Sequence, residues 1–363
     1  MKSILYRNRL LLVLLFLSLC INIFSRYPAA VEQLYTYGFY PVIAKGLRIL
    51  FGWIPFSIGD IFYFVAGGYL VMTLVSWILY FKKKGFHRST LLSKGKKLVI
   101  TFLFVYILFN LLWGINYNRI GIAGQLQLKV TPYTILQLDT LATVLQERLN
   151  EYAGKVDTTT RYQLNSNSIL FRQAVKVYRQ AATSYPFLTY HYPSIKPTLY
   201  SYIGQYIGFT GYYNPFTGEA QLKTSVPSFL KPFIVTHEIA HQLGYGKENE
   251  ANFVAFLSCR AAHDIHFRYS VYFELFWYAI GDMSRKQAKL DMVGKLRLHP
   301  QVLKDYDTLM QYMTSTENGM EPYMSRFYDQ YLKLNNQPKG TQTYNEVIAW
   351  LIAYQKKFGR ESI

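Results

Sequence analysis

The sequence predicts an α-helical membrane anchor of three transmembrane helices, followed by a mainly helical α+β domain outside the membrane. Three observations predict it. The first half of the chain has three long apolar segments, a strongly basic loop lies between the second and third, and after Tyr117 the pattern changes to amphipathic helices with one Tyr- and Gly-rich stretch. A chain of 363 residues is long enough for two such units, which we place at residues 1–116 and 117–363.

The apolar segments are Leu10–Phe24, Ile61–Phe81 and Leu98–Ile115. The second and third carry no charge, and about 20 residues suffice to cross the hydrocarbon core of a bilayer. The first could instead be a cleaved signal peptide or lipoprotein leader, but no A-x-A site follows it promptly, and bulky Leu19 precedes Cys20. We therefore expect it to be retained as a third span.

Charge orients the chain in the membrane. The loop between the second and third spans carries seven basic residues and no acidic one: Lys82, Lys83, Lys84, Arg88, Lys94, Lys96 and Lys97. Positive loops stay in the cytoplasm, so we expect everything after Ile115 to lie outside. The net charge of +18 is compatible with nucleic-acid binding, but membrane topology and anionic lipid explain the densest cluster of basic residues. We expect the lipid bilayer as a partner and no nucleic acid.

The first outer loop, residues 25–60, is rich in aromatic and aliphatic residues, with Lys45 and Arg48 among them. This composition predicts an amphipathic helix at the membrane interface. We expect a lipid-facing connector, with a cover over the outer domain as the alternative.

The outer domain shows helical periodicity over most of its length. Helices are predicted over residues 134–152, 168–185, 269–283, 301–313, 322–334 and 344–358. Turn signals at Gly208–Gly211 and Asn214–Gly218 predict short strands and hairpins within residues 198–226. Glu219 is expected to be an exposed turn residue there.

The candidate site lies in the stretch from Phe233 to Arg260. His237 and His241 are four residues apart, so on a helix both imidazoles project from one face, with Glu238 beside the first. This HExxH pattern suits Zn²⁺, because two imidazoles hold the cation and the carboxylate accepts a proton from the water that it acidifies. Pro232 and Gly244 predict where the helix begins and ends. A structural helix with two satisfied histidines is the alternative.

Two glutamates are candidates for the third metal ligand. On a helix starting at Glu248, this residue shares its face with small or polar residues, which would let the helix approach the HExxH helix closely. Glu250 shares its side with Phe253 and Leu257 instead. We therefore prefer Glu248 and keep Glu250 as the alternative. Asn252, one turn further, is expected either to orient a ligand by a hydrogen bond or to be satisfied within its own helix.

HEIAH followed by Glu248-Asn-Glu-Ala-Asn252 resembles the gluzincin pattern, HExxH plus ExxA[D/N], of membrane-embedded CAAX-type proteases and phage-repressor-cleaving peptidases. Only six residues separate His241 from Glu248, fewer than those families usually show. More of the chain resembles an uncharacterised family of bacterial, Bacteroidetes-type membrane proteins with a predicted zinc-peptidase domain. The matching pieces besides the metal segment are Gly38–Pro41, Pro55–Asp60, Thr210–Thr217, Arg268–Ser270 and Tyr328–Lys333.

This resemblance implies a zincin-like domain on the outer side of a bacterial cytoplasmic (inner) membrane. The expected activity is zinc-dependent hydrolysis of a peptide or protein substrate, with Glu238 as general base and proton shuttle. In zincins generally a sheet edge beside the HExxH helix pairs with an extended substrate, and residues 211–222 are the candidates for that edge. The candidate donors to the developing oxyanion are Tyr269, which we prefer, and Arg268, His266 and Tyr344.

Two other functions fit the same pattern. One is a binding or sensor ectodomain that keeps zinc only for structure, although such a site has no use for a base at Glu238. The other is a zinc-dependent hydrolase of a non-peptide substrate, such as a linkage of the cell envelope.

Overall fold

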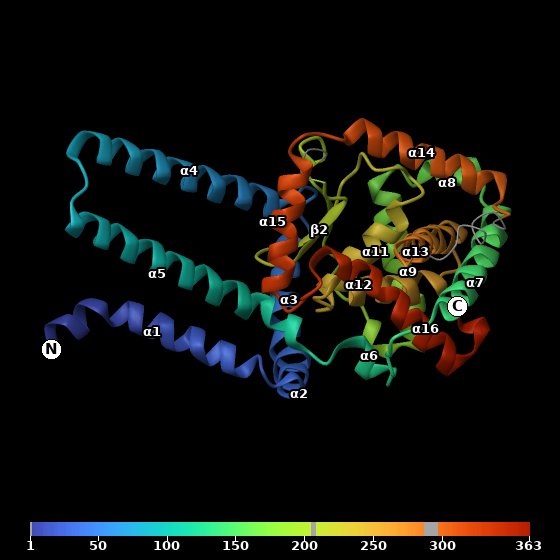
Figure 1. The fold of residues 1–363 in the computed structure, drawn as a ribbon, viewed down its shortest axis with the longest axis horizontal. Helices are drawn as coiled ribbons and strands as arrows, with labels where there is room; N and C mark the ends of the chain where they lie inside the picture. The colour runs from blue at the N-terminus through green and yellow to red at the C-terminus, as the bar shows by residue number, and fades with distance from the viewer. Residues whose placement is uncertain (1, 205–207, 287–296) are drawn as a thin grey trace.

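The computed structural model describes residues 2–204, 208–286 and 297–363. Long helices extend to one side of the molecule, and a mainly helical domain with a small sheet lies at the other (Figure 1). The long helices are α1 (Lys2–Phe24), α4 (Ile58–Lys84) and α5 (Arg88–Leu112). The described chain is thus mostly helical, with long apolar helices and a small sheet, as the sequence predicts.

Two helices are long and apolar enough to cross a membrane. These are α4 and α5, with mean hydropathies of 1.8 and 1.7. Within the described residues a third candidate exists only as a bent pair, Asn8–Phe24 with Pro28–Phe51, which turns by 99° at its break. The count is therefore two, or three if the bent pair is one span. α1 packs along α5, and Lys96 of α5 donates to Asn8 at 2.6 Å.

The segment after α1 packs on the domain, although we expected mainly a lipid-facing connector. It forms α2 (Pro28–Ala30), a π-helix η1 (Val31–Phe39) and α3 (Tyr40–Phe51). Glu32 of η1 pairs with Arg119 at 2.7 Å, and the Tyr40 hydroxyl donates to the Gln242 carbonyl at 2.8 Å. Its outer side still exposes Leu34, Val42 and Trp53. The alternative, a segment that covers the domain, describes this side of the molecule better.

The domain is built around one buried helix, α12 (Glu248–Arg260). Against it pack α11 (Lys231–Gln242), α9 (Asn167–Ser184), α13 (Ile265–Arg285) and α16 (Val347–Phe358). α7 (Ile135–Ala153) covers α13 and begins at a capping box of Thr134 and Gln137. The remaining elements are η2 (Gly114–Asn118), α6 (Gly121–Gln125), α8 (Thr158–Gln163), η3 (Pro186–Leu188), α14 (Pro300–Thr316), α15 (Glu321–Leu334), η5 (Gly340–Glu346) and η6 (Arg360–Ser362).

A three-stranded sheet lies against α11. Its order is β1 (Ile195–Pro197), β3 (Glu219–Leu222), β2 (Gly211–Asn214), with β1 parallel and β2 antiparallel to β3. The hairpin of β2 and β3 lies where the turn signals predict it. β1 lies just before the predicted region. The sequence did not predict it, because a strand of three residues is too short to show an alternating pattern.

The N-terminus of α4 is fastened to this sheet by Glu219, which is fully buried and not an exposed turn residue. Its carboxylate accepts from the backbone N–H groups of Gly59 at 2.7 Å and Ile58 at 3.2 Å. A carboxylate suits this place, because the first N–H groups of a helix have no partners within the helix and carry partial positive charge. The expectation for Glu219 failed because its partners lie about 160 residues earlier in the chain.

Candidate metal centre

α11 carries the HExxH residues and is buried over its whole length. The structure agrees with the predicted start at Pro232 and with a stop at Gly244, whose φ is +83°. That backbone conformation favours glycine. A side chain there would also meet Asn116, because a Cβ on Gly244 would lie 3.0 Å from its Oδ1.

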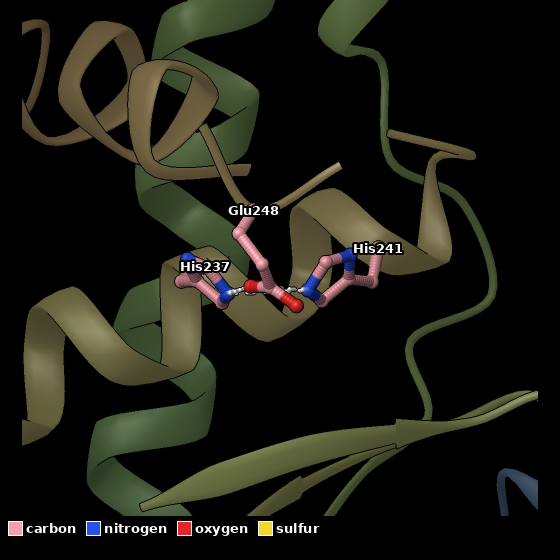
Figure 2. Close-up of side chains that lie close together, drawn as sticks. All are labelled: His237, His241 and Glu248. Carbon is pink, nitrogen blue, oxygen red and sulfur yellow. Dashed lines mark hydrogen bonds and ion pairs between the residues drawn. The ribbon is translucent and has the colours of Figure 1, made fainter. Parts of the chain in front are cut away.

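His237, His241 and Glu248 converge on one point (Figure 2). The two Nε2 atoms are 3.1 Å apart, and Glu248 Oε2 lies 3.1 Å from His237 Nε2 and 3.6 Å from His241 Nε2. The first two residues come from α11 and the third from the first turn of α12. All three side chains are buried. Two imidazoles and one carboxylate are a donor set that zinc sites use.

The outer nitrogens of both imidazoles are bound to oxygen atoms. His241 Nδ1 lies 2.7 Å from the carbonyl oxygen of Tyr245, which can only accept, so Nδ1 carries the proton. His237 Nδ1 lies 2.8 Å from Asn252 Oδ1, which is likewise an acceptor. In the neutral imidazoles the lone pairs are therefore on the two Nε2 atoms that face Glu248. This arrangement fits a metal cation between the three groups, and Asn252 lies where an orienting residue would.

The electrostatics of the three groups also favour a cation. Burial opposes charge on His241, but Glu248 outweighs burial and raises the pKa of His241 to about 9. Burial likewise opposes charge on Glu248, but His241 and His237 outweigh it and hold its pKa well below the usual range. One positive charge among three converging lone pairs is thus stabilised, whether a proton or a metal ion supplies it.

Glu238 lies beside these groups, and its Oε2 has no hydrogen-bond partner in the part of the chain that the structure describes. Its side chain is buried. Burial raises the pKa of Glu238 to about 7. Gly211 of β2 leaves room for it, because a Cβ there would lie 2.7 Å from Glu238 Oε1. A buried, unpaired carboxylate with a raised pKa can accept and return a proton near neutral pH.

Glu250, the alternative ligand, points elsewhere. Its carboxylate packs against Gly121 of α6, in the space that a side chain at this position would fill. Among the described residues, the group within metal-binding distance contains Glu248 and not Glu250. The two residues separate because positions 248 and 250 face different sides of one helix.

The structure does not bring Tyr269 to the three ligand candidates. Its hydroxyl donates to Asp305 Oδ2 at 2.5 Å, and burial raises its pKa further above the ordinary value. Asp305 also pairs with Arg161 at 2.8 Å, so Tyr269 belongs to a buried ionic cluster between α13, α14 and α8. Arg268 donates to the carbonyl of Ala262, and His266 pairs with Thr160. The side chain of Tyr344 lies outside the described part of the chain.

Two aromatic residues that the sequence analysis did not assign contact the site. The Tyr328 hydroxyl of α15 donates to Glu248 Oε1 at 2.8 Å. Trp113, directly after α5, donates from its indole N–H to the His241 carbonyl at 2.9 Å and packs edge-on against that imidazole. They lie 80 and 128 residues from their partners, so no spacing rule relates them. The only sequence signal was that Tyr328 begins one of the matching family pieces.

Side chains from before the domain satisfy the last carbonyl groups of α11. Besides Trp113, Tyr40 and Arg48 donate to the carbonyl of Gln242. Just beyond the helix, Arg119 of the domain itself donates to the carbonyl of Gly244 at 3.2 Å. The final carbonyls of a helix have no partners within it, so these donors determine how the helix ends. The face of α11 that carries the candidate ligands is therefore held partly by residues 40–113.

Comparison with known protein families gives one match. The model described as "Protein of unknown function (DUF3810)" matches residues 35–352, which include α4, α5 and the candidate metal centre but not α1. No curated protein and no solved structure matches the chain.

Proposed function

Since the chain belongs to the DUF3810 family, whose description assigns no activity, we propose from the site itself that it is a membrane-anchored zinc-dependent metallopeptidase. One observation carries the proposal: three buried ligand atoms converge beside the unpaired carboxylate of Glu238. A purely structural zinc site needs the three ligands but gives Glu238 no role. The likeness to bacterial gluzincin-like proteins belongs to the same proposal.

His237, His241 and Glu248 would hold the ion. Bound zinc would acidify a water molecule and polarise the carbonyl of the scissile bond. Glu238 would take the proton of that water and pass it to the leaving amine. Tyr328 holds Glu248 from the side opposite the histidines, so that Oε2 stays directed at them. In this proposal Tyr328 is the tyrosine that contacts a candidate ligand, in place of Tyr269, which the sequence favoured.

β2 would bind the substrate. It is one of the two edge strands of the sheet, and Gly211 at its start lies next to Glu238. An extended peptide could pair with its free backbone groups and pass the candidate ligands. The substrate would thus be a peptide or protein segment without secondary structure.

We place the domain outside a bacterial cytoplasmic membrane. The short connection between α4 and α5, with the basic residues flanking it, lies at the end of these helices remote from the domain (Figure 1). A cytoplasmic position of that connection puts the candidate site on the extracytoplasmic side.

The test is to purify the full chain in detergent and measure bound zinc and peptide cleavage together. The Glu238→Gln variant should keep one zinc per chain and lose at least about a hundredfold in cleavage of a proteome-derived peptide library. Glu317→Gln, at an exposed position, is the matched control and should keep both properties.

His237→Ala should lose the zinc as well. If the wild type binds zinc but cleaves no peptide, the peptidase proposal fails, and the remaining explanations are a structural zinc site or a non-peptide substrate. A wild type without stoichiometric metal would refute the proposal as a whole.

A further inference from the structure

The helix α15 has an outer face that no described residue covers. The exposed apolar residues on this side are Met320, which directly precedes the helix, and Tyr323, Phe327 and Leu334 within it; their accessible fractions are 57, 73, 71 and 86%. At 100° per residue these four positions fall within one narrow stripe of the helix. Arg326 and Lys333 lie to one side of that stripe. An exposed apolar stripe beside basic residues is typical of a helix that lies on a membrane.

The inner face of α15 lies on the metal centre. Tyr328 donates to Glu248, and Tyr331 stacks on Tyr328 at 6.0 Å between ring centroids. Leu332, on the same side, is fully buried. α15 therefore covers the candidate ligands from one side with two tyrosines.

The position of α15 identifies what its outer face meets. The Tyr331 hydroxyl is 3.3 Å from that of Tyr117, only five residues after α5 ends. Tyr63, near the start of α4, lies close enough to Tyr331 for an electrostatic interaction. In Figure 1, α15 lies between the domain ends of α4 and α5 and the helices α11 and α12, and it runs across the direction of the long helices. A membrane crossed by α4 and α5 would have its surface at this level.

Other exposed aromatic residues occur at the same level. Tyr37, Phe39 and Trp53 project from η1 and from the end of α3, which run alongside the domain ends of the long helices (Figure 1). Aromatic residues gather at the boundary between hydrocarbon and headgroups. The stripe on α15 and these exposed aromatic residues thus belong to elements at the domain ends of the long helices.

We infer that the outer face of α15 binds the lipid interface of the membrane that α4 and α5 cross, and that this contact seats α15 as a cover on the metal centre. Lipid is favoured over a protein partner because the stripe lies beside the exposed apolar surface of the adjacent long helices, and because Arg326 suits phosphate headgroups. The lipid contact stands on its own, whereas the role as a cover rests on the proposed zinc site.

The first measurement locates residue 327. In a chain with Cys20→Ala and Cys259→Ala, Phe327→Cys is labelled with an environment-sensitive fluorophore and reconstituted at one protein per lipid nanodisc. Lipids with a nitroxide near the headgroup should quench it at least about twofold, and aqueous iodide should quench it weakly. Leu303→Cys is the matched control, because Leu303 is 50% exposed and lies in the first turn of α14, whose start is remote from the long helices (Figure 1). It should show the opposite pattern.

Iodide quenching at position 327 equal to that at position 303, without quenching by lipid, would overturn the inference. Protection from both quenchers would also overturn it, since a protein would then cover the stripe.

The second measurement tests the cover. The double variant Tyr323→Asp, Phe327→Asp should lose zinc to a chelator on the order of tenfold faster than the wild type in nanodiscs, because an unseated helix opens more often. Leu303→Asp should match the wild type. Unchanged zinc loss despite lipid quenching would refute the cover. Absence of zinc from the wild type would instead refute the proposed function, and the lipid contact would stand.

Discussion

In each candidate ligand imidazole, the hydrogen bond of Nδ1 determines that Nε2 is the nitrogen available to a metal. Tyr245 contributes a backbone carbonyl to His241, which substitution of its side chain leaves in place, and Asn252 contributes a side-chain oxygen to His237. Only the second contact can therefore be removed by substitution.

Asn252→Ala should lower zinc affinity about 10- to 100-fold, because the imidazole of His237 loses the acceptor that orients it. The measurement is competition with a chromogenic zinc chelator. Asn249→Ala is the control on the same helix, since Asn249 binds Glu346 instead. An Asn252→Ala variant with wild-type affinity would show that Asn252 serves only its own helix.

Gly211 matters because its lack of a side chain leaves room for the carboxylate of Glu238. A Cβ on Gly211 would meet both Glu238 Oε1 and, at 2.8 Å, the backbone carbonyl of Gln221. Gly211→Ala should therefore displace Glu238 and reduce peptide cleavage about 10- to 100-fold while bound zinc stays the same. In Gly281→Ala the new methyl group approaches only Arg285, at 3.9 Å, so that variant should keep its activity. Loss of zinc in Gly211→Ala would mean that the sheet supports the ligands rather than the base.

At the scale of elements, the contact between α4 and the sheet depends on one carboxylate. Glu219 binds the first N–H groups of α4, and Ser57 caps the same helix through the N–H of Asp60 at 2.9 Å. Asp60 in turn accepts from Thr198 and Leu199. The start of α4, a candidate span, is thus connected by one hydrogen-bond network to the sheet that packs on α11.

Glu219→Ala should destabilise the folded chain by about 1 to 3 kcal/mol, because it leaves buried N–H groups without an acceptor. Thermal unfolding in detergent measures this, with the exposed Glu317→Ala as the control. Equal midpoints for the two variants would show that water replaces the carboxylate.

At the scale of the whole molecule, the apolar helices and the domain share the metal centre. Tyr40, Arg48 and Trp113 precede residue 117 and bind carbonyl groups at the end of α11. The family match, which includes both regions, is consistent with such a shared structure.

The fragment 117–363 should consequently bind zinc at least about tenfold more weakly than the full chain, since the end of its metal helix loses three donors. Zinc titration followed by circular dichroism would measure binding and folding together. The fragment 26–363, which retains those donors, is the control. Full affinity in fragment 117–363 would show that the domain builds its site alone.

Local patterns allowed much of this protein to be predicted. Apolar length indicated α4 and α5, helical periodicity indicated the domain helices, and a spacing of four placed His237 and His241 on one face. The face of small residues on α12 favoured Glu248 over Glu250, which agrees with the group that the structure brings together. Each of these inferences uses neighbours within a few turns of one element.

The sequence by itself thus determined the two long apolar helices α4 and α5, most domain helices and the residues suited to hold a metal, because periodicity and spacing act over short distances. Only the tertiary structure decided that Glu219 is a buried cap of α4 and that the Tyr269 hydroxyl donates to Asp305. It also decided that Tyr328 and Trp113 contact the candidate site. Those contacts join residues dozens to more than a hundred positions apart. They depend on how whole helices pack, which no local pattern encodes.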